Sequence, residues 1–293
     1  MKPLISIIIP VYNEEKVIAD CLNSLAKQTY ETIEIIVVDD GSTDNTIDII
    51  KNCQLSIVNC QLLHQHHQGP GPARNLGAKS AKGEILVFVD ADMAFHKDFV
   101  KNLVGPIIKG RTIGTFSKNE MVKNYDNIWS ICWNINRNLP PDRMIPENYP
   151  QEAPVFRSIL KRKFDEVGGF DSTGEYTDDW SLSRKLNIRS KAVERAIYYH
   201  NNPSSLKEVW QQARWIGKSE FISGTFLRRI RSLIQFFAPI SLAVGFYKSF
   251  VNYRLLARRS AIEVGSFVIF KLIYDQAIFV SVTKSFYGES KSK

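Results

Sequence analysis

The segment Gly83-Glu84-Ile85-Leu86-Val87-Phe88-Val89-Asp90-Ala91-Asp92 decides how the rest of the chain is interpreted. Its apolar run, residues 85–89, lies between a glycine and two carboxylates, a pattern typical of a central strand buried on both faces. Asp90 and Asp92 share one side of an extended chain and can point oxygen ligands at one divalent cation. In open α/β sheets, ligands bind where such strands end. The segment therefore predicts a metal–diphosphate site, although a strand capped by an Asp-x-Asp turn has the same local sequence.

Charge is distributed unevenly along the chain. With 293 residues, 44% of them hydrophobic, the chain is long enough for one large domain, or for one domain and an appendage. The net charge is +8, but residues 1–204 carry 24 Lys and Arg against 25 Asp and Glu, while residues 205–293 carry 14 against 5. A basic last third is typical of contact with an anionic membrane surface or with nucleic acid. Its charges flank apolar stretches too long for a solvated arm, which disfavours nucleic acid.

The cysteines and the amino terminus indicate a cytosolic compartment. The four cysteines show no spacing typical of metal ligands, and two of them fall in apolar runs with helical periodicity, so reduced thiols are expected. Met1-Lys2-Pro3 leads directly into a predicted strand without the pattern of a signal peptide.

Strand and helix patterns alternate through the first 110 residues. A β-branched run over residues 4–9 is expected to stop at Pro10, and Asn13 is expected to cap the helix that follows. A second buried run, residues 33–38, ends in two adjacent acids. Four such strand–helix units predict a mainly parallel, right-handed sheet with helices on both faces, of the kind that binds nucleotides.

A glycine-rich turn follows a short third strand, with the sequence Gly69-Pro70-Gly71-Pro72-Ala73-Arg74-Asn75. Its glycines permit close approach of the backbone, and Pro72 suits the first turn of a helix. Arg74 would lie near the amino end of that helix, where it can contact a diphosphate. A surface arginine without a ligand is the alternative.

Taken in order, five motifs closely resemble glycosyltransferase family 2, which has the GT-A fold. They are Ile9-Pro10-Val11-Tyr12-Asn13-Glu14, Val37-Val38-Asp39-Asp40-Gly41-Ser42-Thr43-Asp44, Ala73-Arg74-Asn75-x-Gly77, Gly83-Glu84 and Asp90-Ala91-Asp92. The resemblance covers residues 4 to about 200. It implies a sugar nucleotide donor, Mn²⁺ or Mg²⁺ at the Asp-x-Asp motif, and inversion at the anomeric carbon.

The resemblance also assigns roles to individual residues. The implied nucleotide contacts are Pro10, Val11, Tyr12 and Asp40, and the implied metal-linked acids are Asp90 and Asp92, with Asp90 also a donor contact. Asp40 would bind the base and suits the N3–H of uracil, so a UDP-sugar is the expected donor and a GDP-sugar the alternative. For Asp39 and Asp44, roles as turn and helix-cap residues are equally expected.

Two later segments carry the implied catalytic base. Phe164-Asp165-Glu166-Val167-Gly168-Gly169-Phe170-Asp171 resembles the family's Gly-Gly-Phe-Asp turn, and Thr177-Asp178-Asp179 resembles its Thr-Glu-Asp segment with aspartate in place of glutamate. The resemblance places the base on Asp179. An inverting displacement needs one carboxylate beside the acceptor hydroxyl, and a helix start can hold it there while capping the helix. Glu175 is a second candidate.

Further candidate site residues lie between residues 200 and 215. Gln211-Gln212-Ala213-Arg214-Trp215 matches the Gln-x-x-Arg-Trp motif of membrane-embedded polysaccharide synthases of family 2. By analogy Gln211 and Trp215 would border the acceptor, and Arg214 the diphosphate. His200 is a candidate third metal ligand or diphosphate contact, and a purely structural histidine is the alternative.

From Phe226 onward the composition becomes apolar and basic. Residues 233–247 form an apolar stretch that is short for a membrane span, and residues 261–282 carry three charges on one side of a helix. A spanning hairpin would place three arginines between these stretches on the far side of the membrane, against the positive-inside tendency. Helices lying in the cytoplasmic interface are favoured, and the hairpin remains the alternative.

These observations define the expected organisation. We expect a catalytic domain over residues 1–225, with a donor half (1–110) and an acceptor half (111–225), and a membrane-association region over 226–293. The expected activity transfers a sugar to a lipid-linked or polysaccharide acceptor at the cytoplasmic membrane face. A sugar nucleotidyltransferase, the first alternative, would want a basic glycine-rich loop after the first strand. A non-catalytic membrane-bound scaffold, the second, would not require acids at successive strand ends.

Overall fold

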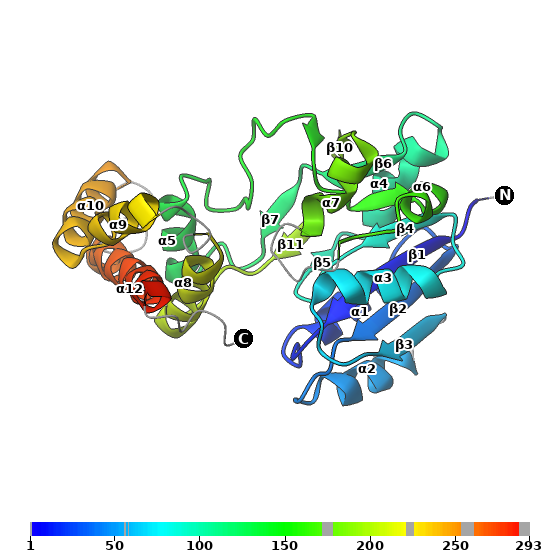
Figure 1. Ribbon diagram of the computed structural model, residues 1–293, viewed down its shortest axis with the longest axis horizontal. Helices are drawn as coiled ribbons and strands as arrows, with labels where there is room; N and C mark the ends of the chain where they lie inside the picture. Colours follow the sequence, from blue (N-terminus) through cyan, green and yellow to red (C-terminus); the bar gives the residue numbers. More distant parts are fainter. Residues whose placement is uncertain are drawn as a thin grey trace. The chain divides into compact units, whose positions relative to one another are not determined.

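A computed structural model describes residues 2–55, 57, 59–171, 178–220, 226–252 and 261–286 (Figure 1). It consists of two compact units, each assembled from two segments of the chain. The α/β unit comprises Met1–Met121 and Ile145–His200, and the helical unit comprises Val122–Met144 and Asn201–Lys293. This division into compact units differs from the regions 1–225 and 226–293, which remain a functional prediction.

The α/β unit is built on an eight-stranded mixed sheet. Its strand order is β3 (Cys60–His64), β2 (Ile33–Asp39), β1 (Ile5–Val11), β4 (Ile85–Phe88), β9 (Ser158–Leu160), β6 (Gly114–Ser117), β10 (Ser190–Val193) and β8 (Glu152–Ala153). The first four strands in this order are parallel, whereas β9 runs antiparallel to both β4 and β6. The mostly parallel sheet confirms the predicted α/β class.

Alternate residues of β1 explain why helices cover both faces of this sheet. Ile5, Ile7 and Ile9 pack on one face with α1 (Ile18–Ala26), α2 (Thr46–Gln54) and α4 (Phe99–Ile108). On the other face Ile8 packs with α3 (Pro70–Ser80), α6 (Lys161–Glu166) and α7 (Asp178–Leu186). A strand buried on both sides needs apolar residues at every position, which accounts for the continuous β-branched run.

A small second sheet lies beyond the carboxyl end of β4. Its order is β5 (Ala94–Phe95), β11 (Tyr198–His200) and β7 (Glu120–Val122), and Tyr198 pairs with Phe95 in antiparallel register. This sheet brings residues 94, 120 and 200 together although they are far apart in the sequence.

Two local predictions about the first turn were wrong. Strand β1 continues through Pro10 to Val11, because its pairing with β4 ends at Ile8 and the missing N–H of Pro10 therefore removes no ladder bond on that side. Asn13 does not cap α1, which begins at Ile18 without a side-chain cap. Instead Asn13 adopts a positive φ of 57°, and its Oδ1 accepts a hydrogen bond from the Thr43 amide at 2.7 Å.

In its described residues the helical unit contains α5 (Ile128–Asn136), α8 (Leu206–Glu220), α9 (Phe226–Gln235), α10 (Ala238–Val251) and α12 (Ala261–Phe286). Helix α12 packs against each of the other four, with Phe267 and Phe270 buried beside Trp133 of α5. Within the described residues one helix segment, Gly265–Lys284, is long and apolar enough to cross a membrane. The apolar stretch 233–247 is not one helix, because α9 ends at Gln235 and α10 begins at Ala238.

Candidate active site

The predicted donor residues meet at the carboxyl edge of the main sheet. The register pairs Val11 at the end of β1 with Asp39 at the end of β2, and the Asp40 amide donates to the Val11 carbonyl at 2.8 Å. Strand β4 ends beside them, two residues before Asp90. The fold therefore brings the ends of three parallel strands to one place, as the sequence predicted.

Asp90 lies between two arginines. Arg74 on α3 donates through Nη2 to Asp90 Oδ1 at 2.7 Å, and Arg157, which precedes β9, donates through Nη1 to Oδ2 at 2.9 Å. Desolvation opposes ionisation of Asp90, but the charges of Arg157 and then Arg74 hold its pKa well below the usual range. Asp90 is therefore a carboxylate with both oxygens engaged, and the two guanidinium groups carry one more positive charge than it neutralises.

Aromatic rings support both guanidinium groups. Arg74 Cζ lies 5.6 Å from the centroid of the Phe170 ring, and Arg157 Cζ lies 5.7 Å from that of Tyr198. Cation–π contact and ion pairing together restrict each side chain to one position. An anionic group with several oxygens, such as a diphosphate, would meet a preformed cationic surface here.

His200 links two further carboxylates. Its Nδ1 lies 2.5 Å from Glu120 Oε1 on the neighbouring strand β7, and its Nε2 lies 3.3 Å from Asp92 Oδ1. Burial alone would lower the pKa of His200, but Asp92 and Glu120 raise it to about 10. The Nε2 atom is buried and has no partner in hydrogen-bonding geometry, so this nitrogen faces Asp92 without completing a bond. The sequence analysis identified His200 as a candidate ligand but did not identify Glu120.

A fourth acid completes the cluster of negative charge. The pKa of Glu14 is raised to about 7 by burial and then by the charges of Asp92, Asp44 and Asp90. Mutual repulsion among these carboxylates would be relieved by a bound cation. No group of three or more His, Cys, Asp or Glu residues suited to a metal ion occurs in the described part of the chain. Asp92, 55% exposed, nevertheless fits a divalent ion whose other ligands are phosphate and water, and His200 Nε2 fits it once the ion displaces the proton that its raised pKa retains.

Asp40 lies under a stacked pair of rings. Its side chain is buried and accepts hydrogen bonds from the Gly69 amide at 2.8 Å and the Gln68 amide at 2.9 Å. His67 Nδ1 lies 2.9 Å from Asp40 Oδ2, and the His67 ring stacks on Tyr12 at 4.0 Å between centroids. The resemblance assigns Asp40 to the base and Tyr12 to the nucleotide, and His67 contacts both of these residues.

The two neighbouring acids have local hydrogen-bonding roles. Asp39 accepts from the Gly41 and Ser42 amides of the turn, where Gly41 has a positive φ of 83°. Asp44 accepts from the amide and hydroxyl of Thr46, the first residue of α2. The Asp39 contacts are those of a turn residue, whereas Asp44 binds the first residue of α2 from the position before its N-cap, Asn45.

The predicted base lies at the start of α7. Helix α7 spans Asp178–Leu186 and is anchored to the main sheet by the buried side chain of Leu182. The backbone of Asp179 is therefore in the first turn of this helix, where a carboxylate is favoured by the helix dipole. The side chain of Asp179 and the whole of Glu175 lie outside the described residues, so the role of Asp179 stays a prediction.

The Gln-x-x-Arg-Trp residues lie on α8 of the helical unit. Gln211 and Trp215 are exposed, whereas Arg214 is half-buried and its carbonyl oxygen accepts a hydrogen bond from the Ser281 hydroxyl at 3.0 Å. Their assignment to acceptor and diphosphate remains a prediction.

Arg157, Glu120 and His67 are site residues that the sequence did not reveal. Each lies outside the recognised motifs and reaches the site through tertiary packing. Arg157 does so because β9 pairs with β4, and Glu120 because β7 pairs with β11. His67 lies in the loop after β3, the strand that pairs with β2. Arg157 directly precedes the short strand Ser158–Leu160, which is too short for its periodicity to give a clear signal.

Comparison with known proteins identifies the family and the fold. The family model "Glycosyl transferase family 2" matches residues 6–168. The chain is 39% identical over 237 residues to "Glycosyltransferase GlyG" of Streptococcus pneumoniae, covering 73% of this chain and 76% of GlyG.

Two solved structures share the fold. The chain matches S. aureus TarS 1-349 in complex with UDP-GlcNAc with a TM-score of 0.55 and 19% identity, covering 97% of this chain and 92% of that one. It matches the mannosyltransferase PcManGT from Pyrobaculum calidifontis, in complex with GDP-Man and Mn²⁺, with a TM-score of 0.57 and 15% identity, covering 100% and 76%. The fold is thus that of known sugar-transfer enzymes, and the sequence match over more than half its length shows that this chain belongs to glycosyl transferase family 2.

Proposed function

We propose that the chain transfers a sugar, with inversion, from a nucleoside diphosphate sugar to a lipid-linked or polysaccharide acceptor. The observation that carries this proposal is the Arg74–Asp90–Arg157 arrangement beside Asp92 and His200. A leaving nucleoside diphosphate gains negative charge as the glycosidic bond breaks, and preformed cations stabilise that charge without a proton donor. A nucleotidyltransferase, by contrast, would need a basic glycine-rich loop after β1, where Tyr12, Asn13 and Glu14 stand.

Asp92 and His200 would hold the divalent ion, Mn²⁺ or Mg²⁺, with Asp90 fixed between its arginines on the donor side. When bound, such an ion supplies Lewis-acid stabilisation of the diphosphate. Glu120 would orient His200 through Nδ1, and Nε2 would take the ligand position after releasing its proton to solvent. Support for a metal also comes from PcManGT, whose complex contains Mn²⁺.

We infer a UDP-sugar as the donor. The acid Asp40 lies at the position where the family binds the base, and Tyr12 offers a ring for stacking. TarS binds UDP-GlcNAc, which favours the same nucleotide here. A GDP-sugar is the second candidate, because PcManGT binds GDP-Man with the same fold.

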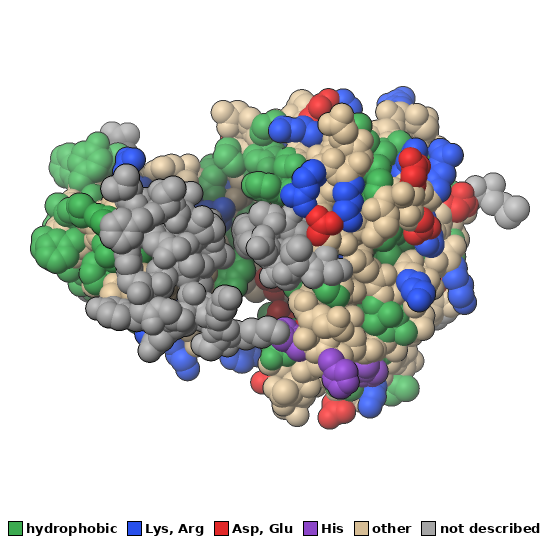
Figure 2. Space-filling model, viewed as in Figure 1, with side chains coloured by type: hydrophobic (Ala, Val, Ile, Leu, Met, Phe, Trp, Pro, Cys, Tyr) green, Lys and Arg blue, Asp and Glu red, His purple; other side chains and the backbone are tan. Residues whose placement is uncertain are grey.

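For the acceptor side, the proposed base is Asp179 and the proposed location is the cytoplasmic membrane face. Helix α10 exposes large apolar side chains at helical spacing, with Phe246 65% exposed and Phe250 81% exposed. Figure 2 shows such hydrophobic side chains gathered over α10. With a net charge of +9 in residues 205–293, this surface suits an anionic lipid interface better than bulk water.

A donor screen tests the proposal. Purified full-length protein is incubated with UDP- and GDP-sugars and Mn²⁺ or Mg²⁺, and the released nucleoside diphosphate is measured. We expect slow, metal-dependent hydrolysis of one donor, abolished by EDTA and by Asp92→Asn but retained in Asp48→Asn, an exposed acid on α2 outside the donor motifs. Cleavage that is equal with and without metal, or a product of nucleoside monophosphate, would overturn it.

A further inference from the structure

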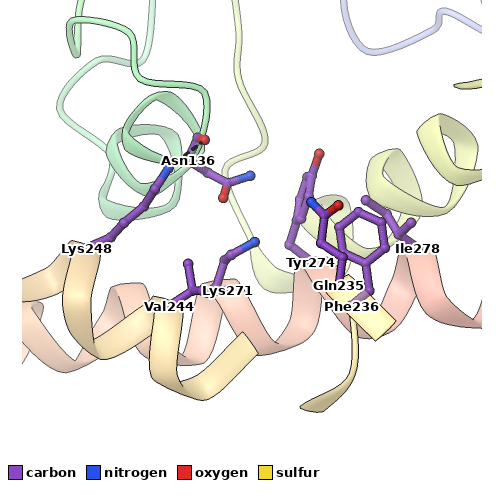
Figure 3. A pocket seen from close by; sticks show the side chains of 8 residues that line it. All are labelled: Asn136, Gln235, Phe236, Val244, Lys248, Lys271, Tyr274 and Ile278. Carbon is purple, nitrogen blue, oxygen red and sulfur yellow. Dashed lines mark hydrogen bonds between the residues drawn. The ribbon is translucent and has the colours of Figure 1, made fainter. Parts of the chain in front are cut away.

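The helical unit contains a cavity of about 350 Å³ with two lysines in its wall (Figure 3). Its polar lining is Asn136 of α5, Gln235 of α9, Lys248 of α10 and Lys271 of α12, and Phe236 and Ile278 form an apolar side. The lining residues include no acid. Since a water molecule occupies about 30 Å³ in the liquid, the cavity has room for a small organic anion.

Lys271 is buried, with 8% of its surface exposed. Its Nζ donates to Asp275 Oδ1 at 2.6 Å, and the Asp275 side chain is 1% exposed. An ammonium group has three donors, and this carboxylate takes one of them. Figure 3 shows the Lys271 ammonium pointing into the space between Asn136 and Tyr274, whose ring centroid is 5.7 Å from Nζ. The buried ion pair stabilises the lysine and leaves donor capacity directed at the cavity.

Lys248 brings a second cation to the same wall. Its Nζ donates to the Ile135 and Asn136 carbonyls at 3.4 and 3.0 Å and to Asn138 Oδ1 at 3.1 Å, at the carboxyl end of α5 where a cation is favoured. All three of its donors are engaged, so Lys248 would act on a bound anion through its charge. Burial and then the charge of Lys271 lower the pKa of Lys248. The two ammonium groups therefore repel one another, and Asp275 is the one carboxylate within reach of both that the described residues show. A bound anion would relieve this repulsion.

We propose that this cavity binds a phosphate ester, with Lys271 donating to the phosphate, the charge of Lys248 beside it, and Phe236 and Ile278 against its carbon chain. Lysine binds phosphate as a compact point charge, and the amides of Asn136 and Gln235 add neutral donors. The apolar side favours a ligand that is charged at one end only. A phosphate on an alkyl chain and a phosphate on a polyol share this chemistry. The site lies wholly in the helical unit and does not depend on the proposed transferase activity.

Titration calorimetry on the full-length protein tests this site with inorganic phosphate, glycerol 1-phosphate and hexyl phosphate. Phosphate binding is expected with all three, and an ester should bind about tenfold more tightly than inorganic phosphate. Tighter binding of hexyl phosphate identifies a lipid-type ligand, and tighter binding of glycerol 1-phosphate a polyol phosphate. Absence of saturable binding at millimolar concentrations of all three overturns the proposal.

The variants locate the binding site. Lys271→Met alone leaves Asp275 buried without its partner, so the informative variant is Lys271→Met with Asp275→Leu, in which both charges are replaced by apolar groups of similar size. We expect this double variant to melt near the wild-type temperature and to lose ester binding at least about tenfold. The control is Lys284→Met, an exposed lysine on the same helix. Unchanged affinity in the double variant, or loss of affinity in Arg157→Lys instead, would place the phosphate elsewhere and overturn the proposal.

Discussion

The imidazole of His67 stacks on the ring of Tyr12, with 4.0 Å between the centroids. The same imidazole lies 2.9 Å from Asp40 Oδ2. His67 therefore occupies both the face of Tyr12 on which a nucleobase would stack and the Asp40 oxygen that would accept its hydrogen bond. Under the proposed function, the base must displace His67 before it can bind.

The first prediction is therefore that His67→Ala tightens UDP binding by roughly two- to tenfold, the worth of one aromatic stacking contact. Tyr12→Ala should weaken it by a similar factor. Calorimetry with UDP measures both, and His66→Ala, an exposed neighbour, is the control. Weaker binding in His67→Ala would mean that His67 is a wall of the base site.

The second prediction concerns the cation. Asp92→Asn should lower metal-dependent turnover by about a hundredfold or more, because a neutral amide replaces a carboxylate ligand. Binding of Mn²⁺, followed by its electron paramagnetic resonance signal in the presence of UDP, should weaken in the same variant. Full activity of a folded Asp92→Asn protein would contradict the assignment.

The third prediction concerns Arg157, whose Nη1 is bonded to Asp90. In Arg157→Lys the planar guanidinium group and its contact with the Tyr198 ring are lost while the positive charge remains, so UDP affinity should fall by about tenfold. Arg162→Lys, on the exposed surface of α6, should bind UDP like the wild type. If Arg157→Lys binds UDP with unchanged affinity, Arg157 serves only to hold Asp90 in place and does not contact the donor.

The fourth prediction separates the two sides of the reaction. Asp179→Asn should lower sugar transfer by roughly a hundredfold or more, because no general base remains to accept the proton of the acceptor hydroxyl. UDP affinity should stay the same, because the donor contacts are unchanged. Steady-state transfer and UDP calorimetry are measured on one preparation. Loss of UDP binding would move Asp179 to the donor side.

The fifth prediction concerns the exposed face of α10. Phe246→Ser with Phe250→Ser should weaken binding to vesicles of anionic lipid by roughly tenfold or more, since each aromatic side chain loses its burial in the interface. Vesicle sedimentation measures this, and Leu55→Ser, an 87% exposed apolar residue of the α/β unit, is the matched control. Equal sedimentation of all three proteins would count against membrane binding through α10.

The sequence predicted the donor side of the fold well because its signals are local. Asp90 and Asp92 follow a continuous apolar strand, and in a parallel sheet this places them at the carboxyl edge. The sequence could not predict that Asp90 would accept from two arginines, because Arg157 arrives on an antiparallel strand inserted between β4 and β6. Such pairing depends on tertiary packing, which a periodicity pattern does not encode.

The helical unit shows a second limit of the same kind. Composition suggests a functional boundary at residue 225, which stays a prediction, but it does not indicate which helices pack together. Helix α5 carries Trp133 and belongs with α12, although about 130 residues separate them, because their apolar faces bury one another. Amphipathic periodicity shows that a helix has a buried face but does not say which distant helix covers it.

The discontinuous helical unit also imposes an order on biosynthesis. Helix α5 leaves the ribosome long before α12, whose last described residue is Phe286. At a translation rate of about 5–20 residues per second, the apolar face around Trp133 and Ile135 stays exposed for roughly 8–30 s before α12 has been synthesised and can pack against it. During that interval the α/β unit also lacks its last strands, since β11 follows α5 in the chain. The nascent protein therefore exposes an aromatic helix at mid-synthesis, and a stop codon within α12 should give a chain that depends on chaperones rather than a smaller soluble enzyme.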